Sequence, residues 1–249
     1  MPECVNEVPA EISPITYKHK SYDLIILGYQ PWFLSPSIPT ISLLKSDAFK
    51  AVLNNTSIVT VIGARNMWLN SQTSVVDLIK KAGGRIIGNL PLIDKASNLL
   101  SALSILHWML NGKKERKWGV LPLPGVAQQD IKGSASYGQL LKQHIITGKL
   151  NSFQQALVQA GGLMINTNIL FIEGRAKDIF RFWASLILKK EAAGKNRTLW
   201  VGFFKYYLIV ALFIVSPIII LSYNVLIRPL TIRKIKDQKL QFSYLGMRK

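Results

Sequence analysis

The chain has 249 residues, which is enough for one domain of ordinary size with an additional segment. Its 31 Lys and Arg residues against 13 Asp and Glu residues give a formal net charge of +18, which indicates an anionic partner, either nucleic acid or the anionic face of a membrane. The single cysteine, Cys4, excludes an intramolecular disulfide framework and a multi-cysteine zinc site.

The amino-terminal stretch differs in character from the rest of the chain. Residues 1–21 contain three prolines and no periodic hydrophobic pattern, so we predict an irregular segment. Acidic residues occur early and no apolar run follows them, so no secretory signal is indicated. Strand and helix patterns alternate after this segment, and residues 22–190 are therefore expected to form one domain.

The first strand is predicted at Leu24–Leu27, where four consecutive apolar residues are typical of a strand buried on both faces. Gly28 ends the run, and the loop that follows carries three prolines and several aromatic residues. A helix is then expected from Ile41 to Leu53, because apolar side chains recur there near one stripe.

A second unit of the same kind follows. Ile58–Ile62 is rich in β-branched residues and is predicted to be a strand, with a loop at residues 63–68 and an amphipathic helix at residues 69–82. Arg85 begins a third strand. Two strand–loop–helix units of about thirty residues each are typical of a parallel sheet. The predicted fold class is α/β, a doubly wound parallel sheet in three layers.

The remainder of the domain is predicted to be mainly helical. A helix is expected at Ala96–Asn111, followed by a long loop at residues 118–134 that would lie over the crevice at the carboxyl ends of the strands. The other predicted elements are helices at residues 136–147, 151–159 and 176–190 and a strand at residues 165–172.

A membrane segment is predicted near the carboxyl end. Residues 206–227 contain no charged residue, and their length matches the roughly twenty residues needed to cross a bilayer core of about 30 Å. We therefore predict a hydrophobic transmembrane helix within residues 199–227, followed by a basic tail at residues 228–249. A single span is the default prediction, and a hairpin bent at Pro217 with both ends cytoplasmic is the alternative, because both flanks are basic.

The positive charge is better explained by lipid than by nucleic acid. No helix-turn-helix, RNP or zinc-finger pattern accompanies the basic residues. The expected partners are the lipid bilayer, through residues 206–227, and anionic lipid head groups. The expected location is the membrane, with the domain in the cytoplasm.

Three stretches resemble one protein family. DLIILGYQPWFLSPSIPT at residues 23–40 resembles the flavin loop of flavodoxin-like proteins, in which an apolar strand leads into a glycine, an aromatic residue and a Ser/Pro-rich turn. With VTVIGARNMWLNSQ at residues 59–72, HWMLNGKK at residues 107–114 and the hydrophobic span, it is similar to the dialkylresorcinol condensing enzymes, flavodoxin-like proteins encoded beside pigment pathways of the flexirubin type. The resemblance covers most of the chain.

The resemblance implies FMN as a cofactor, in the crevice at the carboxyl ends of the strands. Rigid aromatic rings suit a flat isoalloxazine, Asn66 is expected to bond to ring carbonyls, and Arg65 is expected to stabilise negative charge. The simpler interpretation is that the rings pack the loop and that Arg65 is a solvated or lipid-facing cation. The residues expected at the cofactor are Gly28, Tyr29, Trp32, Phe33, Ser35, Gly63, Arg65, Asn66 and Trp68.

A flavodoxin-like chain normally begins with a strand, a Ser/Thr-rich phosphate loop and a helix, and this unit is missing from the sequence. Met1 aligns with the interior of the family pattern. We expect that the sequence is a fragment or starts late; loss of the phosphate loop is the alternative. A doubly wound sheet without its central first strand would leave backbone groups unpaired, which is costly.

The resemblance implies a place in the formation of dialkylresorcinols from two acyl chains, and a pathway ketosynthase is an expected partner. Oxidising a dialkylcyclohexanedione to a resorcinol removes two electrons, so the leading hypothesis is a membrane-anchored oxidoreductase. Cys4 lies in a proline-rich tail and is not expected to be a condensing nucleophile. His107 is interpreted as a core residue, no catalytic residue is assigned, and no metal site is predicted. The alternatives are a membrane NAD(P)H:quinone reductase and a cofactor-free scaffold for the pigment enzymes.

Overall fold

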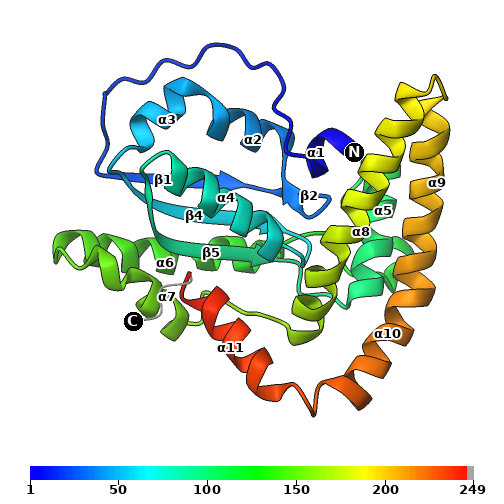
Figure 1. The fold of residues 1–249 in the computed structure, drawn as a ribbon. Helices are drawn as coiled ribbons and strands as arrows, with labels where there is room; N and C mark the ends of the chain where they lie inside the picture. Colours follow the sequence, from blue (N-terminus) through cyan, green and yellow to red (C-terminus); the bar gives the residue numbers. More distant parts are fainter. Residues whose placement is uncertain (246–249) are drawn as a thin grey trace.

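The computed structural model describes residues 1–245 and shows an α/β fold built on a parallel sheet of three strands (Figure 1). The strands are β1 (Leu24–Tyr29), β4 (Ser57–Ala64) and β5 (Arg85–Ile93), with β4 in the centre. All three strands are rich in apolar and β-branched residues, which is typical of parallel strands that are largely buried. The two parallel units predicted from sequence spacing are confirmed.

The helices follow the strands in the expected alternation, with α2 and α3 in place of the one predicted helix. The chain breaks at Ser46, whose hydroxyl accepts the Phe49 amide and caps α3. A small hairpin, β2 (Pro31–Trp32) and β3 (Ser35–Pro36), lies between β1 and α2. The α-helices are α1 (Pro2–Val5), α2 (Ile38–Lys45), α3 (Asp47–Leu53), α4 (Leu69–Lys81), α5 (Asn98–Asn111), α6 (Gln128–Ile146), α7 (Phe153–Gln159), α8 (Thr167–Ala192), α9 (Arg197–Val210), α10 (Ser216–Ser222) and α11 (Ile232–Ser243).

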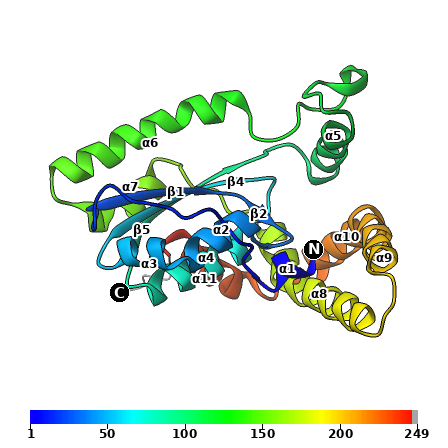
Figure 2. The same cartoon turned by 90° about the horizontal axis from the view of Figure 1, so that it is seen from above.

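One face of the sheet is fully covered. Alternate side chains of each strand, among them Leu27, Ile58 and Ile62, point into a core that also holds residues of α2, α3, α4 and α8. In Figure 2 these helices lie together on one side of the strands. This is the larger of the two apolar clusters and it accounts for most of the buried side chains of the sheet.

The opposite face is covered over only part of its area. Val59 and Leu90 pack against Phe153 and Leu157 of α7 and Leu141 of α6. Toward the carboxyl end of β1 the cover stops, and Ile26 is 59% exposed. The outer edge of β1 has no strand partner among the described residues, whereas the edge of β5 is capped where the Asn89 amide donates to Gln154 Oε1 at 2.7 Å.

Helix α8 lies across the carboxyl ends of the strands (Figure 1). The sequence prediction of a strand at residues 165–172 is wrong, because Asn166 accepts the amides of Asn168 and Ile169 and starts α8 at Thr167. The predicted helix at residues 176–190 is the distal part of this helix. The predicted loop at residues 118–134 ends earlier than expected, since α6 begins at Gln128.

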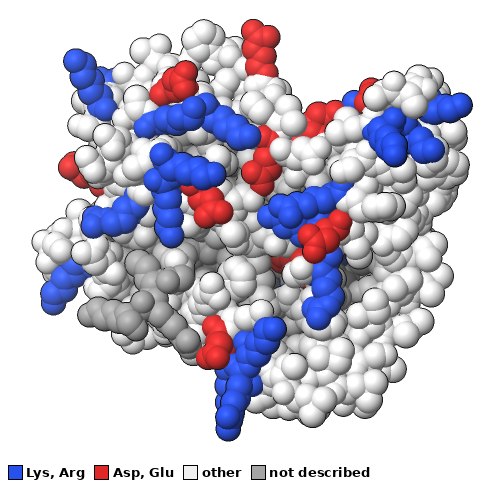
Figure 3. Space-filling model, in the orientation of Figure 1, with Lys and Arg blue, Asp and Glu red and all other residues white. Residues whose placement is uncertain are grey.

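A continuous apolar helix follows α8 and runs antiparallel to it. It comprises α9, α10 and two π-helical turns at Ala211–Val215 and Tyr223–Ile227, and it spans Arg197–Ile227, 31 residues. This is the one described helix that is long and apolar enough to cross a membrane. On the face of the molecule drawn in Figure 3, the surface of this helix is almost free of Lys, Arg, Asp and Glu.

The two terminal segments are more ordered than predicted. The irregular amino-terminal segment contains α1, which packs against α8. The basic tail forms α11 and returns to the domain, where Phe242 and Leu245 pack against the main core and Gln154 Nε2 donates to the Ser243 carbonyl at 2.6 Å. The domain and the tail are therefore folded together. Residues 246–249 of the predicted tail lie outside the described residues.

Candidate functional site

The open part of the sheet is a flat apolar surface, here called the floor and formed by Ile26, Gly28, Val61 and Gly63. These residues share one face because Gly28 pairs with Val61 in the parallel register and side chains alternate along each strand. Both glycines are exposed. A Cβ placed on either would meet no heavy atom within 4 Å, so open space lies above them.

On the covered side of the sheet, Glu173 of α8 is bonded to the N-terminus of α4. This side chain is 1% exposed, its Oε1 accepts the Asn70 amide at 2.8 Å, and Asn70 Nδ2 donates to the Glu173 carbonyl at 2.7 Å. It therefore caps α4, whose own N-cap residue Trp68 makes no side-chain bond. Burial raises the pKa of Glu173 to about 7 although backbone hydrogen bonds oppose the rise.

Tyr29 belongs to a buried hydrogen-bond chain on the covered face. Its hydroxyl donates to Gln72 Oε1 at 2.7 Å, Gln72 Nε2 donates to Thr60 at 3.0 Å, and the Thr60 hydroxyl donates to Asn89 Oδ1 at 3.0 Å. Desolvation raises the pKa of Tyr29 well above its ordinary value. The structure places this predicted cofactor residue in the core, where its ring contacts protein.

The other predicted aromatic residues separate into two groups. Trp68 is buried in the main core. Trp32 and Phe33 are exposed at the hairpin, and the Phe33 ring lies 6.2 Å from that of Phe204 on α9. Ser35 is buried in the same hairpin. These side chains do not converge on one pocket, so the sandwich of rings expected for a flavin is not assembled by the described residues.

Arg65 and Asp94 meet at the ends of the central and third strands. Burial lowers the pKa of the Arg65 guanidinium, and the Asp94 carboxylate raises it. Asp94 also accepts the Ala96 amide at 2.9 Å, the Ser101 hydroxyl at 2.7 Å and the Gly125 amide at 3.3 Å. The carboxylate fastens α5 and the loop after it to the sheet. Arg65 is thus a half-buried partner of Asp94 rather than a solvated cation, and sequence reasoning missed Asp94.

Cys4 and His107 are the two other side chains considered as catalytic groups, and both are engaged in contacts within the protein. Burial raises the pKa of the Cys4 thiol to about 11, so it is a poor nucleophile. His107 is hydrogen-bonded to Asn111 through Nδ1, and its Nε2 lies 3.5 Å from Glu115. Within residues 1–245, no group of three His, Cys, Asp or Glu side chains is placed to hold a metal ion.

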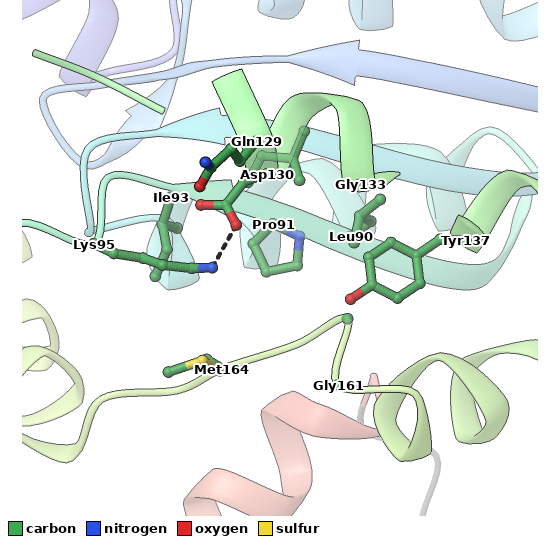
Figure 4. Close-up of a pocket in the computed structure, with 12 residues that line it drawn as sticks. Leu90, Pro91, Ile93, Lys95, Gln129, Asp130, Gly133, Tyr137, Gly161 and Met164 are labelled. Atoms are coloured by element: carbon green, nitrogen blue, oxygen red, sulfur yellow. Dashed lines mark hydrogen bonds and ion pairs between the residues drawn. The ribbon is translucent and has the colours of Figure 1, made fainter. Parts of the chain in front are cut away.

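A separate small cavity lies beside β5 (Figure 4). Its volume is about 140 Å³, and Tyr137, Met164 and the Lys95–Asp130 ion pair of 2.6 Å lie at its wall. Pockets that bind drug-sized ligands usually measure roughly 300–1,000 Å³, so this cavity is too small for an isoalloxazine ring system. The floor is the better candidate for a flat ligand.

Comparisons of this chain with protein-family models, curated proteins and solved structures find no match. The candidate site is therefore argued from the chain's own geometry.

Proposed function

We propose that this chain is a membrane-anchored, flavodoxin-like protein of the dialkylresorcinol condensing enzyme type that binds the ring of a dialkylcyclohexanedione or resorcinol lipid. The observation that carries the proposal is the floor, an exposed apolar surface at the carboxyl ends of adjacent parallel strands. Ligands of open α/β sheets bind at this end of the strands. The order β1-β4-β5 agrees with one half of a doubly wound sheet.

The neighbourhood of the floor suits a ligand with alkyl chains. Helix α5 lies beyond the carboxyl ends of the strands on the same side as α6 (Figure 2), and it exposes several leucines. A ring lying on Gly28 and Gly63 would bury apolar area on both partners, while its alkyl chains extend toward α5. Burial of this kind contributes about 25 cal/mol per Å² of apolar surface.

The proposed reaction is the two-electron oxidation of the cyclohexanedione ring. The ring loses two hydrogen atoms in total, as a hydride and a proton, and enolisation of its carbonyl groups gives the aromatic resorcinol. An added acceptor of the nicotinamide or flavin class would have to supply the oxidising power by taking up the hydride. This chain's residues would bind and orient the ring; no described side chain is assigned to proton transfer.

FMN fits the described residues only in part. The floor accepts a flat ring, but the N-terminus of α4, where a phosphate would gain backbone amides and a favourable dipole, already holds the Glu173 carboxylate. Tyr29 and Trp68 are core residues. We therefore derive no step through FMN.

The test compares two glycine substitutions in detergent-purified protein. Gly63→Leu places a side chain over the floor at a position where a Cβ meets no heavy atom within 4 Å, and Gly138→Leu on α6 is the matched control because its Cβ also meets open space. Incubation with a dialkylcyclohexane-1,3-dione and FMN or NAD(P)⁺ is followed by mass spectrometry of the resorcinol. We expect at least a tenfold loss with Gly63→Leu alone. Equal product from both variants, or none from the wild type with any acceptor, contradicts the proposal.

A cofactor-free scaffold for the pigment enzymes is the second candidate, favoured by the burial of Tyr29 and Trp68 and by the occupied α4 terminus. An absorption spectrum separates the two. Bound oxidised flavin gives bands near roughly 375 and 450 nm, as expected for the cofactor that carries the redox chemistry. Absence of these bands after FMN loading, together with absence of resorcinol formation, supports the scaffold.

A further inference from the structure

Two exposed apolar surfaces lie at the same end of the molecule. Helix α5 exposes Leu103, Leu106 and, most fully, Met109 at 76% and Leu110 at 75%. The Arg197–Ile227 helix is also largely unburied. Figures 1 and 2 both place α5 and this helix beyond the carboxyl ends of the strands. Exposed apolar area of this extent, present on two helices at one end of the molecule, marks an interaction surface.

The chemistry around α5 identifies the partner as an anionic lipid surface. The helix runs directly into GKKERKWGV at residues 112–120, which has four cations and one carboxylate, with Trp118 79% exposed. Lys114 lies over the Trp108 ring and Lys117 over the Trp118 ring, at 5.4 and 4.7 Å. Amphipathic aromatic rings and lysines beside an apolar face are the residues that settle at the level of lipid head groups.

The Arg197–Ile227 helix is held against the domain along its length. The Trp183 ring of α8 lies 5.7 Å from that of Phe204, and Phe171 of α8 stacks on Tyr223 at 3.8 Å. Helix α8 is itself fixed to α4 through Glu173 and carries many charged residues, so it cannot enter the bilayer core with its partner.

Both ends of the same helix are also attached to the domain. At its beginning, Arg197 pairs with Glu3 of α1 and with Glu191 of α8. After its end, α11 returns to the core and is bonded to Gln154 of α7. A helix crossing the bilayer would separate these two attachments by the roughly 30 Å of the hydrocarbon core.

We propose that the chain is monotopic: the Arg197–Ile227 helix lies in the plane of one leaflet, and α5 with residues 112–120 forms a second contact with the same anionic bilayer surface. This inference deepens the membrane attachment of the proposed function and replaces a crossing by an in-plane anchor. It also brings the end of the floor nearest α5 to the lipid.

The first experiment tests sidedness with single engineered cysteines. Ile146→Cys on α6 and Lys239→Cys on α11 are exposed sites, and the buried Cys4 thiol reacts slowly because its pKa is raised. Spheroplasts of an expression host are treated with a membrane-impermeant maleimide before and after lysis. We expect both positions to react identically, on one side of the membrane. Labelling of one from outside and the other only after lysis overturns the monotopic topology.

The second experiment tests the α5 contact with an environment-sensitive NBD label. Met109→Cys is compared with Ile146→Cys, an equally exposed apolar position (73%) on α6. Vesicles with about 30% anionic lipid carry a negative surface potential, and they should blue-shift the label and raise its intensity severalfold at residue 109 only. The response should weaken in neutral vesicles and in a variant with residues 113, 114, 116 and 117 changed to Gln.

Two results overturn the α5 contact. One is an equal response at residues 109 and 146. The other is a concentration-dependent change at residue 109 without vesicles, which indicates a second copy of the chain as the occupant. Neither readout involves flavin binding or resorcinol formation, so failure of the proposed oxidation leaves this inference standing, and failure of the inference leaves the oxidation to be judged by its own assay.

Discussion

The two faces of the sheet have the same strands but different surroundings. On the covered face, alternate residues such as Ile58 and Ile62 are fully buried under α2–α4 and α8. On the other face, cover from α6 and α7 ends before the carboxyl end of β1, and Ile26 remains exposed. Parallel sheets are usually buried on both faces. The difference indicates that the covered face contributes more to stability, and the open face is the one at which we propose that the ligand binds.

Truncating one isoleucine on each face should give the largest difference in stability between the two faces. Ile62→Ala removes a fully buried side chain and leaves a cavity, so the free energy of unfolding should fall by about 2–5 kcal/mol. Ile26→Ala on the open face should cost less than about 1 kcal/mol, because its side chain is largely in solvent already. Urea unfolding in detergent measures both. Equal losses would show that the open face is covered in solution.

The pH dependence of the free energy of unfolding should reflect the titration of Glu173 on the covered side. Its folded pKa, about 7, lies above the ordinary value of 4.5, so the folded state binds more protons than the unfolded state between these values. The free energy of unfolding should therefore fall as the pH rises through this window, by at most on the order of 3 kcal/mol.

Glu173→Gln should remove this decline, since the amide oxygen still accepts from Asn70 and carries no charge. Glu11→Gln, at an exposed position of the amino-terminal segment, is the control and should retain the wild-type profile. Chemical unfolding at pH 5 and pH 8 is sufficient. An unchanged pH profile in Glu173→Gln would place the titrating group elsewhere.

Glycine-to-alanine substitutions should affect stability differently in the covered and the open parts of the same face. A Cβ on Gly88 would lie 2.5 Å from the Phe153 ring, so Gly88→Ala should destabilise the fold by about 1–3 kcal/mol. Gly63→Ala meets open space and should change stability by less than about 0.5 kcal/mol. Similar losses at both positions, measured by thermal unfolding, would mean that the floor is filled.

The sequence predicts the elements of this fold better than its site. The strands at residues 24, 58 and 85 follow from apolar runs and regular spacing. The strand predicted at residues 165–172 failed because an apolar run does not distinguish a strand from the buried start of a helix, and the N-cap Asn166 was the available signal. Glu173 and Asp94 were missed because their partners depend on packing; Glu173 and Asn70 are 103 residues apart.

Strand alternation supplies the clearest missed signal. Tyr29 is in phase with Leu27, so it points to the covered face, whereas Gly28 is in phase with Ile26 and faces the open one. The aromatic residue drew the cofactor prediction although its phase already placed it in the core. The alternation of side chains along each strand thus assigns Gly28 and Gly63 to the floor, although neither residue has a side chain.

Removal of one hydroxyl gives the smallest contrast and tests this assignment. Tyr29→Phe keeps the ring and leaves Gln72 Oε1 without its donor in a buried position, so stability should fall by about 1–2 kcal/mol. Trp32→Phe, at an exposed site in the hairpin, should stay within about 0.5 kcal/mol. Because Tyr29 lies on the covered face, its loss should leave ring binding at the floor unchanged when stability is restored by cooling. If Tyr29→Phe instead weakened ring binding under conditions in which the variant is fully folded, the ligand would lie on the covered side. The division of roles between the two faces would then be wrong.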